Sequence, residues 1–216
     1  MDFTADFYWS VRSPFCYIAM PRVLAMARDY GMQWTLRVVR PIALRDPGFH
    51  KGQHPLARAY HFRDCERVAQ FHGLPYRRPR PDPVAQDPAS HEVARDQPHA
   101  NRLTLLAAQA CREGKGLAFA DELSRTLWNG ETEDWTRGAH LAQAAARAGL
   151  DLARMEDAIA RDPAPLQAQL RENEAAQQSA GHWGVPLFVF RGEPFFGQDR
   201  LDVLLWRMKQ AGLARR

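Results

Sequence analysis

Three short segments carry residue types that could bind or activate a small molecule. Ser13 and Pro14 stand where an aromatic-rich stretch gives way to a long apolar one. Residues 184–186 read Gly-Val-Pro and precede a compact apolar stretch, and residues 197–200 read Gly-Gln-Asp-Arg and precede an amphipathic one. The first and third segments open an expected helix, where backbone N–H groups have no partner within the helix.

Ser13 is suited to activating a thiol that belongs to another molecule. The simpler interpretation is an ordinary N-cap, which stabilises a helix by about 1 kcal/mol. A helix N-terminus also presents unpaired N–H groups and about half a positive charge, which stabilise an anion and lower the pKa of a thiol. The sequence places no His or Asp beside Ser13 to make it a nucleophile. We therefore expect its hydroxyl to donate a hydrogen bond to a bound sulfur anion.

The other two segments could hold the rest of an extended, peptide-like ligand. A proline at a strand start is ordinary, and only about 5–6% of X–Pro bonds are cis. A cis bond between Val185 and Pro186 would leave the N–H and C=O of Val185 free to pair with a peptide in β fashion. At the start of the last helix, backbone amides would bind a carboxylate while Asp199 binds an ammonium group. The γ-glutamyl end of glutathione carries both groups.

Taken together, the three segments resemble a known family. Residues 7–17 (Phe-Tyr-Trp-Ser-Val-Arg-Ser-Pro-Phe-Cys-Tyr) are similar to the active-site strand and helix start of 2-hydroxychromene-2-carboxylate isomerases and kappa-class glutathione transferases. Residues 184–186 resemble their cis-proline segment, and residues 196–201 (Phe-Gly-Gln-Asp-Arg-Leu) resemble their glutathione-end motif. The resemblance spans essentially the whole chain and places it in the DsbA-like part of the thioredoxin superfamily.

This resemblance implies a glutathione-dependent isomerase or transferase with glutathione as its cofactor. Ser13 would bind the glutathione sulfur, Val185 and Pro186 its cysteine backbone, and Gln198 and Asp199 its γ-glutamyl group. In the isomerases, glutathione adds to an unsaturated, aromatic carboxylate, permits rotation about the former double bond and leaves, while the protein supplies orientation and electrostatics. The candidates for lining the pocket of this small acidic substrate are Arg12, Cys16, Arg40, Tyr60, Arg102 and Trp183, with Asn101 and Asp64 behind them.

Two features depart from the family pattern. Position 16 is Cys16, where the family usually has Ser. The stretch around residues 77–97 is longer and richer in proline than expected of the isomerase, which leaves the substrate open.

Two other functions compete with glutathione chemistry. A DsbA-like thiol–disulfide oxidoreductase would use Cys16, but disulfide exchange needs an attacking thiolate and a resolving thiol, and Ser13 occupies the attacking position. We expect Cys16 to be a small apolar core residue instead. A non-catalytic binding domain is the third possibility, and glutathione affinity and insulin reduction distinguish the three.

The order of expected strands and helices around these segments predicts an α/β, thioredoxin-like fold. Residues 1–45 read as strand (3–9), helix (13–30) and strand (34–39), which implies a right-handed parallel crossover. Residues 186–190 and 194–197 read as a hairpin, and a helix follows from residue 198. Between them we expect helices and no strand. The predicted domains are therefore a discontinuous thioredoxin-like domain, 1–45 with 181–216, and a helical domain, 46–180, whose helices span 58–71, 100–112, 118–128, 137–148, 151–161 and 165–180.

The composition excludes several other classes. The 216 residues carry a net charge of only +4. The basic run at residues 76–80 has no aromatic residue between its arginines and no groove-entering helix, so we expect no nucleic-acid partner. The three cysteines show neither CxxC nor metal-finger spacing, so no metal is expected. No signal peptide or membrane-spanning stretch is evident. We expect a soluble cytoplasmic protein and, from the resemblance, a homodimer.

Overall fold

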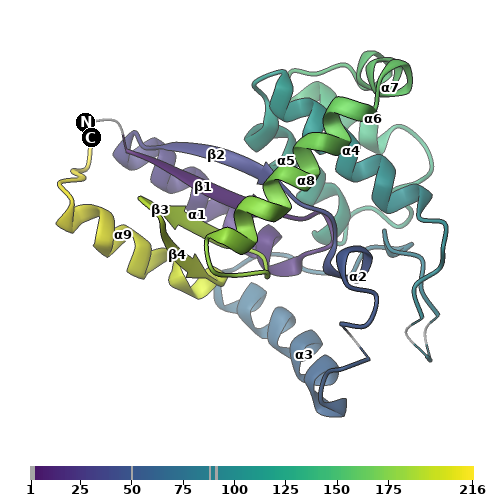
Figure 1. Ribbon diagram of the computed structural model, residues 1–216, viewed down its shortest axis with the longest axis horizontal. Helices are drawn as coiled ribbons and strands as arrows, with labels where there is room; N and C mark the ends of the chain where they lie inside the picture. The colour runs from purple at the N-terminus through teal and green to yellow at the C-terminus, as the bar shows by residue number, and fades with distance from the viewer. Residues whose placement is uncertain (1–2, 50, 88, 91) are drawn as a thin grey trace.

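The two ends of the sequence build one four-stranded sheet. The computed structural model describes residues 3–49, 51–87, 89–90 and 92–216. The strands stand in the order β2-β1-β3-β4, with β1 parallel to β2 and the other neighbours antiparallel (Figure 1). This is the predicted thioredoxin-like arrangement. Its elements are β1 (Thr4–Trp9), α1 (Pro14–Tyr30), β2 (Gln33–Val38), β3 (Leu187–Phe190), β4 (Glu193–Phe196), the 3₁₀ turn η1 (Gln198–Arg200) and α9 (Leu201–Gln210).

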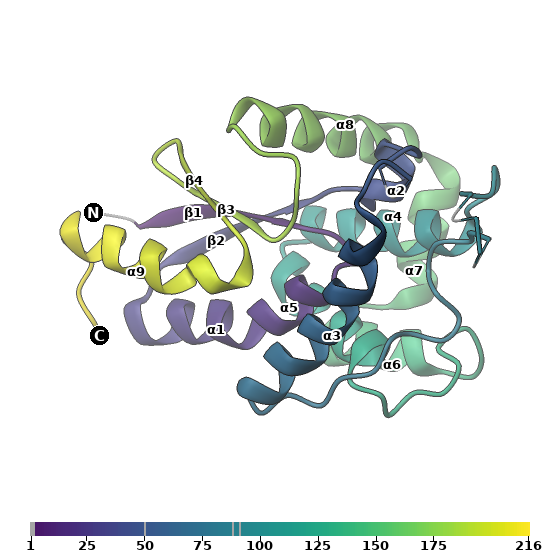
Figure 2. The ribbon, with the colours of Figure 1, turned by 90° about the horizontal axis from the view of Figure 1, so that it is seen from below.

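Aromatic residues on one face of β1 explain why this strand lies at the centre. Phe7 and Trp9 are completely buried, and Phe7 is opposite Phe188 of β3 with their ring centroids 5.0 Å apart. Such offset aromatic pairs stabilise a core beyond the area that they bury. Helices cover both faces of the sheet: α8 (Ala164–Ser179) lies on one side, and α1 and α9 lie on the other (Figure 2).

Helix α1 begins and ends where the sequence predicts. Ser13 is the N-cap, Pro14 is the first helical residue, and Gly31 ends the helix with φ 63°. Only glycine adopts this left-handed conformation without steric cost, which is why it commonly follows the last helical residue. The inner face of α1 packs into the core through Cys16, Ile18 and Met20, among others.

Seven helices lie between β2 and β3 in the described residues, and no strand lies there apart from an isolated bridge between Gln86 and Val93. The sequence missed the four-residue α2, because Pro41 marks the end of the preceding strand. The six predicted helices are present with shifted ends, most of all at 137–148, where the helix starts at His140. The inserted helices are α2 (Ile42–Arg45), α3 (Pro55–Phe71), α4 (Pro98–Arg112), α5 (Gly116–Trp128), α6 (His140–Arg147), α7 (Leu152–Arg161) and α8.

One hydrophobic core runs through the sheet and the inserted helices. Buried residues of β1 and α1 join those of α4, α5 and α7, such as Leu103, Phe119 and Met155. Helix α8 is also tied to the sheet by polar contacts, since the Asn173 side chain donates to the carbonyl of Val38 at 2.9 Å. The predicted division into two domains stays a prediction. Among the described helices, none is long and apolar enough to cross a membrane.

Candidate functional site

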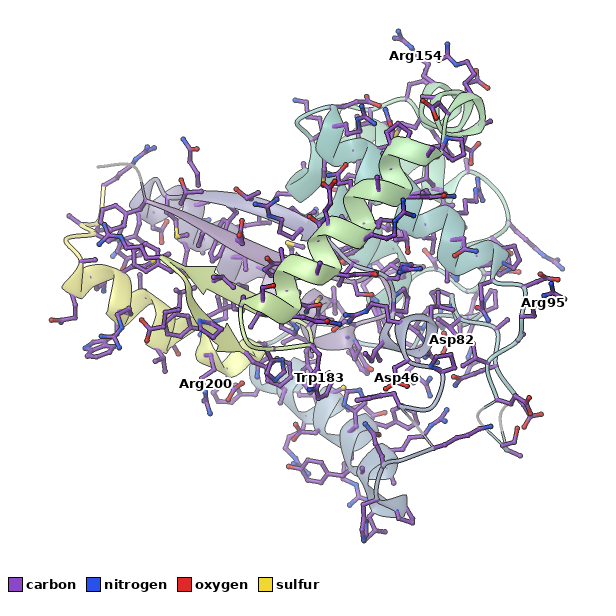
Figure 3. The ribbon with its side chains drawn as sticks, viewed as in Figure 1. Asp46, Asp82, Arg95, Arg154, Trp183 and Arg200 are labelled. Atoms are coloured by element: carbon purple, nitrogen blue, oxygen red, sulfur yellow. The ribbon has the colours of Figure 1, made fainter. Side chains whose placement is uncertain are left out.

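A cavity of about 400 Å³ lies where the N-terminus of α1 meets the inserted helices. Such a volume suits a small molecule rather than a macromolecule. Trp183 from the loop before β3 and Asp82 from the insertion both line it, and both are labelled in Figure 3. The main lining residues are Ser10, Arg12, Ser13, Phe15, Arg45, Phe49, Arg58, His61, Phe62, Tyr76, Arg78, Asp82, Gln86, Trp128, Trp183, Val185 and Phe196.

Ser13 lines this cavity from the N-cap of α1. Its backbone is extended, with φ −100° and ψ 110°, and its Oγ accepts a hydrogen bond from the Cys16 N–H at 3.2 Å. The cap uses a lone pair of the hydroxyl and leaves its proton available for donation. The Ser13 N–H donates to the Ser10 carbonyl at 3.1 Å, which fixes the turn between β1 and α1.

Cys16 lies behind Ser13 in the core and is absent from the cavity wall. Its side chain is completely buried. Burial raises the pKa of the Cys16 thiol to about 12, and hydrogen bonding with Ser13 lowers it by less. The thiol is therefore protonated at neutral pH and out of reach of a ligand. The prediction that Cys16 lines the pocket is wrong, because it faces inward on the first turn of α1, and its interpretation as a core residue fits.

The segment before β3 faces the same cavity. The Val185–Pro186 peptide bond is cis, which the sequence left open. Val185 lines the cavity, and within the described residues nothing hydrogen-bonds to its N–H or C=O. Pro186 is buried, and its carbonyl accepts from the Gly197 N–H at 2.9 Å. That bond brings the third predicted segment beside the second.

Helix α8 positions this loop through a buried glutamine. The Gln177 side chain is completely buried, and its Nε2 donates to the Gly184 carbonyl at 2.7 Å. Its Oε1 accepts from Arg45 of α2 at 2.9 Å, and Arg45 also donates to the carbonyl of Trp183 at 3.1 Å. Gln177 thus holds both the loop that carries Val185 and the side chain of Arg45, which lies opposite this loop.

The third segment lies beyond the cavity wall. Gln198 is buried, its carbonyl accepts from Arg22 at 2.9 Å, and its side-chain oxygen is 3.3 Å from His72. Asp199 is exposed and pairs with Arg200 at 2.7 Å. Both residues lie at the start of the last helical segment, as predicted, and the Gly197–Pro186 bond connects them to the cavity loop.

Of the remaining pocket candidates, the structure brings Arg12 and Trp183 to the cavity and leaves three elsewhere. Arg40 donates to Glu174 from its backbone, its Nε and its Nη2, and it lines a second cavity with Asn101. Arg102 pairs with Glu156 between α4 and α7, and the Tyr60 side chain is exposed on α3. These residues lie in or beside helices whose orientation about their axes the sequence pattern did not establish.

The cavity wall holds three arginines that the sequence did not reveal, Arg45, Arg58 and Arg78, beside the predicted Arg12. Arg12 donates to Asp82 from Nε at 2.7 Å and from Nη2 at 2.9 Å, and Arg78 donates to the same carboxylate at 3.3 Å. Arg45 and Arg58 complete a set of four guanidinium groups with one carboxylate, so the wall is cationic. Burial lowers the pKa of Arg58, and Arg78 and Arg12 lower it further by like-charge repulsion. Such a cavity favours an anionic occupant.

Aromatic rings form the rest of the wall. The Arg78 guanidinium lies 4.0 Å from the Phe62 ring centroid, Phe49 meets Trp183 edge to face at 4.9 Å, and Tyr76 stacks on Trp128 at 6.0 Å. Aromatic rings in such a wall can stack on a flat ligand, and the arginines can bind an acidic group that it carries. No cluster of potential metal ligands is present in the described residues.

Three features of this structure define the thioredoxin-like class: the four-stranded sheet, the polar N-cap of its first helix, and the cis-proline loop that faces this N-cap. The chain belongs to the family of the DSBA-like thioredoxin domain, whose model matches residues 4–209. None of the curated protein sequences matches it.

Solved structures extend the comparison at the level of the fold. The chain is similar to 2-hydroxychromene-2-carboxylate isomerase, with a TM-score of 0.71, 21% identity and coverage of 96% of this chain and 95% of the other. It is similar to a probable DsbA oxidoreductase from Streptomyces coelicolor, with a TM-score of 0.66, 21% identity and coverage of 97% of this chain and 89% of the other. It is also similar to the cytosolic disulfide reductase DsbM from Pseudomonas aeruginosa with GSH. That match has a TM-score of 0.58, 18% identity and coverage of 96% of this chain and 99% of the other.

Proposed function

We propose that this protein is a glutathione-dependent isomerase or transferase of the 2-hydroxychromene-2-carboxylate isomerase type. The observation that carries the proposal is that Ser13 and Val185 line one cavity, and that no described residue pairs with the backbone of Val185. The central cysteine of glutathione needs two partners. One is a hydrogen-bond donor for its sulfur, and the other is a backbone segment that can pair with its peptide groups as a strand does. The relatives add support, since one is named for the isomerase and another is described with GSH.

In the proposed reaction, the residues of this chain orient glutathione and stabilise its thiolate. The Ser13 hydroxyl donates to the sulfur, and the N-terminus of α1 adds a favourable partial charge. Val185 pairs with the cysteine backbone, and Gln198 and Asp199 hold the γ-glutamyl group. The arginines and aromatic rings of the wall hold a flat, acidic, unsaturated substrate against the sulfur. Catalysis is then mainly orientation and electrostatic stabilisation.

Disulfide exchange is the weaker alternative. It requires an accessible thiolate. Cys16 is completely buried, with its thiol pKa raised to about 12, and Cys65 is completely buried on α3. In the described residues, no cysteine lines the cavity.

Calorimetry and ultraviolet absorbance test the proposal on three variants. Wild type should bind glutathione with micromolar to millimolar affinity and generate bound thiolate absorbance at neutral pH. Ser13→Ala loses both the hydroxyl and the cap, whereas Ser13→Gly retains most of the cap and loses only the hydroxyl. Both should lose the thiolate signal, and Ser179→Ala, an exposed site at the end of α8, should keep it. The proposal is contradicted if wild type does not bind glutathione, or if the thiolate signal is unchanged in both Ser13 variants.

A further inference from the structure

Addition of a thiol to a conjugated double bond requires a group that can hold a proton. The S–H bond breaks and an S–C bond forms, while the π electrons become an enolate that takes a proton at carbon; elimination reverses each step. Serine is a poor choice for this task, because an aliphatic hydroxyl is too weak an acid and too weak a base near neutral pH. If the function proposed above holds, one side chain of the cavity must carry that proton, and the inference below rests on that function.

His61 meets the requirement by its place in the cavity. It lines the wall from α3, and its ring meets Phe15 edge to face with centroids 5.3 Å apart. Phe15 lies in the first turn of α1, two residues after Ser13, so Ser13 and His61 bound the same space. Among the described lining residues, His61 is the only histidine. The remaining titratable groups there are arginines, Tyr76 and Asp82, whose oxygens accept bonds from Arg12 and Arg78.

The fold holds the imidazole by one ring nitrogen. His61 Nε2 is 3.7 Å from Cys65 Sγ, one turn further along α3. Cys65 is completely buried, and burial raises the pKa of its thiol to about 12, so the sulfur keeps its proton. Tyr76 hydrogen-bonds to the same sulfur. Within the described residues nothing hydrogen-bonds to Nδ1, so this nitrogen is available to a ligand.

The surrounding charges favour a ring that gains and loses a proton readily. Burial lowers the pKa of His61, Arg78 and Arg12 lower it further, and Asp64 on the next turn opposes them. Arg58 and Asp82 also face this part of the cavity, from α3 and from the following loop. The ring is therefore neutral at pH 7 and able to accept a proton, and its protonated form is a strong donor among arginines.

We propose that His61 is the proton-transfer residue of this site. It takes up the proton that the glutathione thiol releases as Ser13 stabilises the thiolate, and it delivers that proton to the carbon of the enolate once the sulfur has attacked. After rotation, it removes the same kind of proton as the carbon–sulfur bond breaks and returns it to the sulfur. No further oxidant, reductant or co-reactant enters the sequence. Ser13 stabilises the sulfur throughout, and Cys65 is a positioning residue that holds the ring.

Glutathione addition to ethacrynic acid, a conjugated enone that carries a carboxylate, tests this role. His61→Gln should lower kcat by about 10²- to 10⁴-fold, as expected for loss of a general acid–base. Its glutathione affinity and Ser13-dependent thiolate absorbance should stay within about twofold of wild type. The inflection of the pH profile that reports His61 should disappear in this variant, while the inflection set by glutathione ionisation should remain. The matched control is His140→Gln on α6, outside the cavity wall, which should behave like wild type.

A second measurement uses the wild-type protein alone and needs no turnover. Nitrogen-15 NMR of the imidazoles should show the His61 ring titrating below the ordinary range near 6.5 and shifting when glutathione saturates the site. An unchanged kcat in His61→Gln, or a His61 signal that glutathione does not move, overturns the inference. If glutathione binds and Ser13 controls its ionisation while His61 has no effect, only this inference fails. If wild type does not bind glutathione, the proposed function fails with it.

Discussion

Ser13 and Cys16 stand three positions apart, yet their environments differ completely. Ser13 meets the cavity, and Cys16 is buried with its thiol pKa raised to about 12. We therefore expect Cys16 to resist iodoacetamide at pH 8 in the native protein and to react once the chain is unfolded in guanidinium. Peptide mass spectrometry with and without denaturant measures both rates. Rapid native modification of Cys16 would show an exposed thiolate and revive the disulfide-exchange function.

Arg40 has a structural role that the sequence did not reveal. Glu174 is buried and accepts three hydrogen bonds from Arg40, two of them at 3.0 and 2.9 Å. Glu174→Gln removes the charge and one acceptor, and should lower the free energy of unfolding by about 1–3 kcal/mol. Urea denaturation measures this loss, with Glu172→Gln, an exposed site on the same helix, as the control. Equal stabilities of the two variants would show that the pair contributes nothing.

At the scale of elements, the loop before β3 depends on a glycine. A Cβ at Gly184 would lie 2.5 Å from Phe196 Cε2 and 3.0 Å from His182 Cε1, and these two rings stack with centroids 3.8 Å apart. Gly184→Ala must therefore displace the Phe196 ring, which lines the cavity, and overpacking of this kind costs about 1–3 kcal/mol.

We expect Gly184→Ala to fold and to bind glutathione roughly 5- to 30-fold more weakly, if about 1–2 kcal/mol of that cost falls on the bound state. Calorimetry measures the affinity, and Gly52→Ala, whose Cβ would make only ordinary contacts, is the control. Wild-type affinity in Gly184→Ala would mean that these rings do not shape the glutathione site.

The strands and α1 could be predicted because their signals are local. Alternating or continuous apolar residues mark the strands, and Ser13, Pro14 and Gly31 mark the ends of α1. The cavity wall could not be predicted in the same way. Arg58, His61 and Phe62 share one face of α3 with helical spacing, but the sequence does not say which face of α3 meets α1. Asp82 comes from a proline-rich loop whose path depends on contacts with Arg12 and Arg78. The homodimer and the cytoplasmic location stay predictions.

The whole molecule should lose stability at alkaline pH. Burial raises the pKa values of the Cys16, Cys65 and Cys111 thiols from 9.0 to about 12. The unfolded chain releases these protons above about pH 9, whereas the folded chain retains them until about pH 12, so folding is disfavoured progressively as pH rises through this window. Thermal unfolding from pH 7 to 11 should show a falling Tm. A Cys65→Ala variant should show a shallower slope, and an identical slope would mean that this thiol is not protected by folding.

The burial of Cys16 behind Ser13 also bears on how this scaffold can evolve. The resolving position of a dithiol is already filled by a cysteine, packed and protonated, while the attacking position holds an oxygen. Ser13→Cys would supply the missing sulfur without changing the loop, the sheet or the cis-proline segment. The proposed chemistry, which uses the thiol of glutathione, and disulfide exchange, which needs a thiol of the protein itself, are then separated by one substitution. Insulin reduction by Ser13→Cys would measure whether this one substitution is enough to confer disulfide exchange.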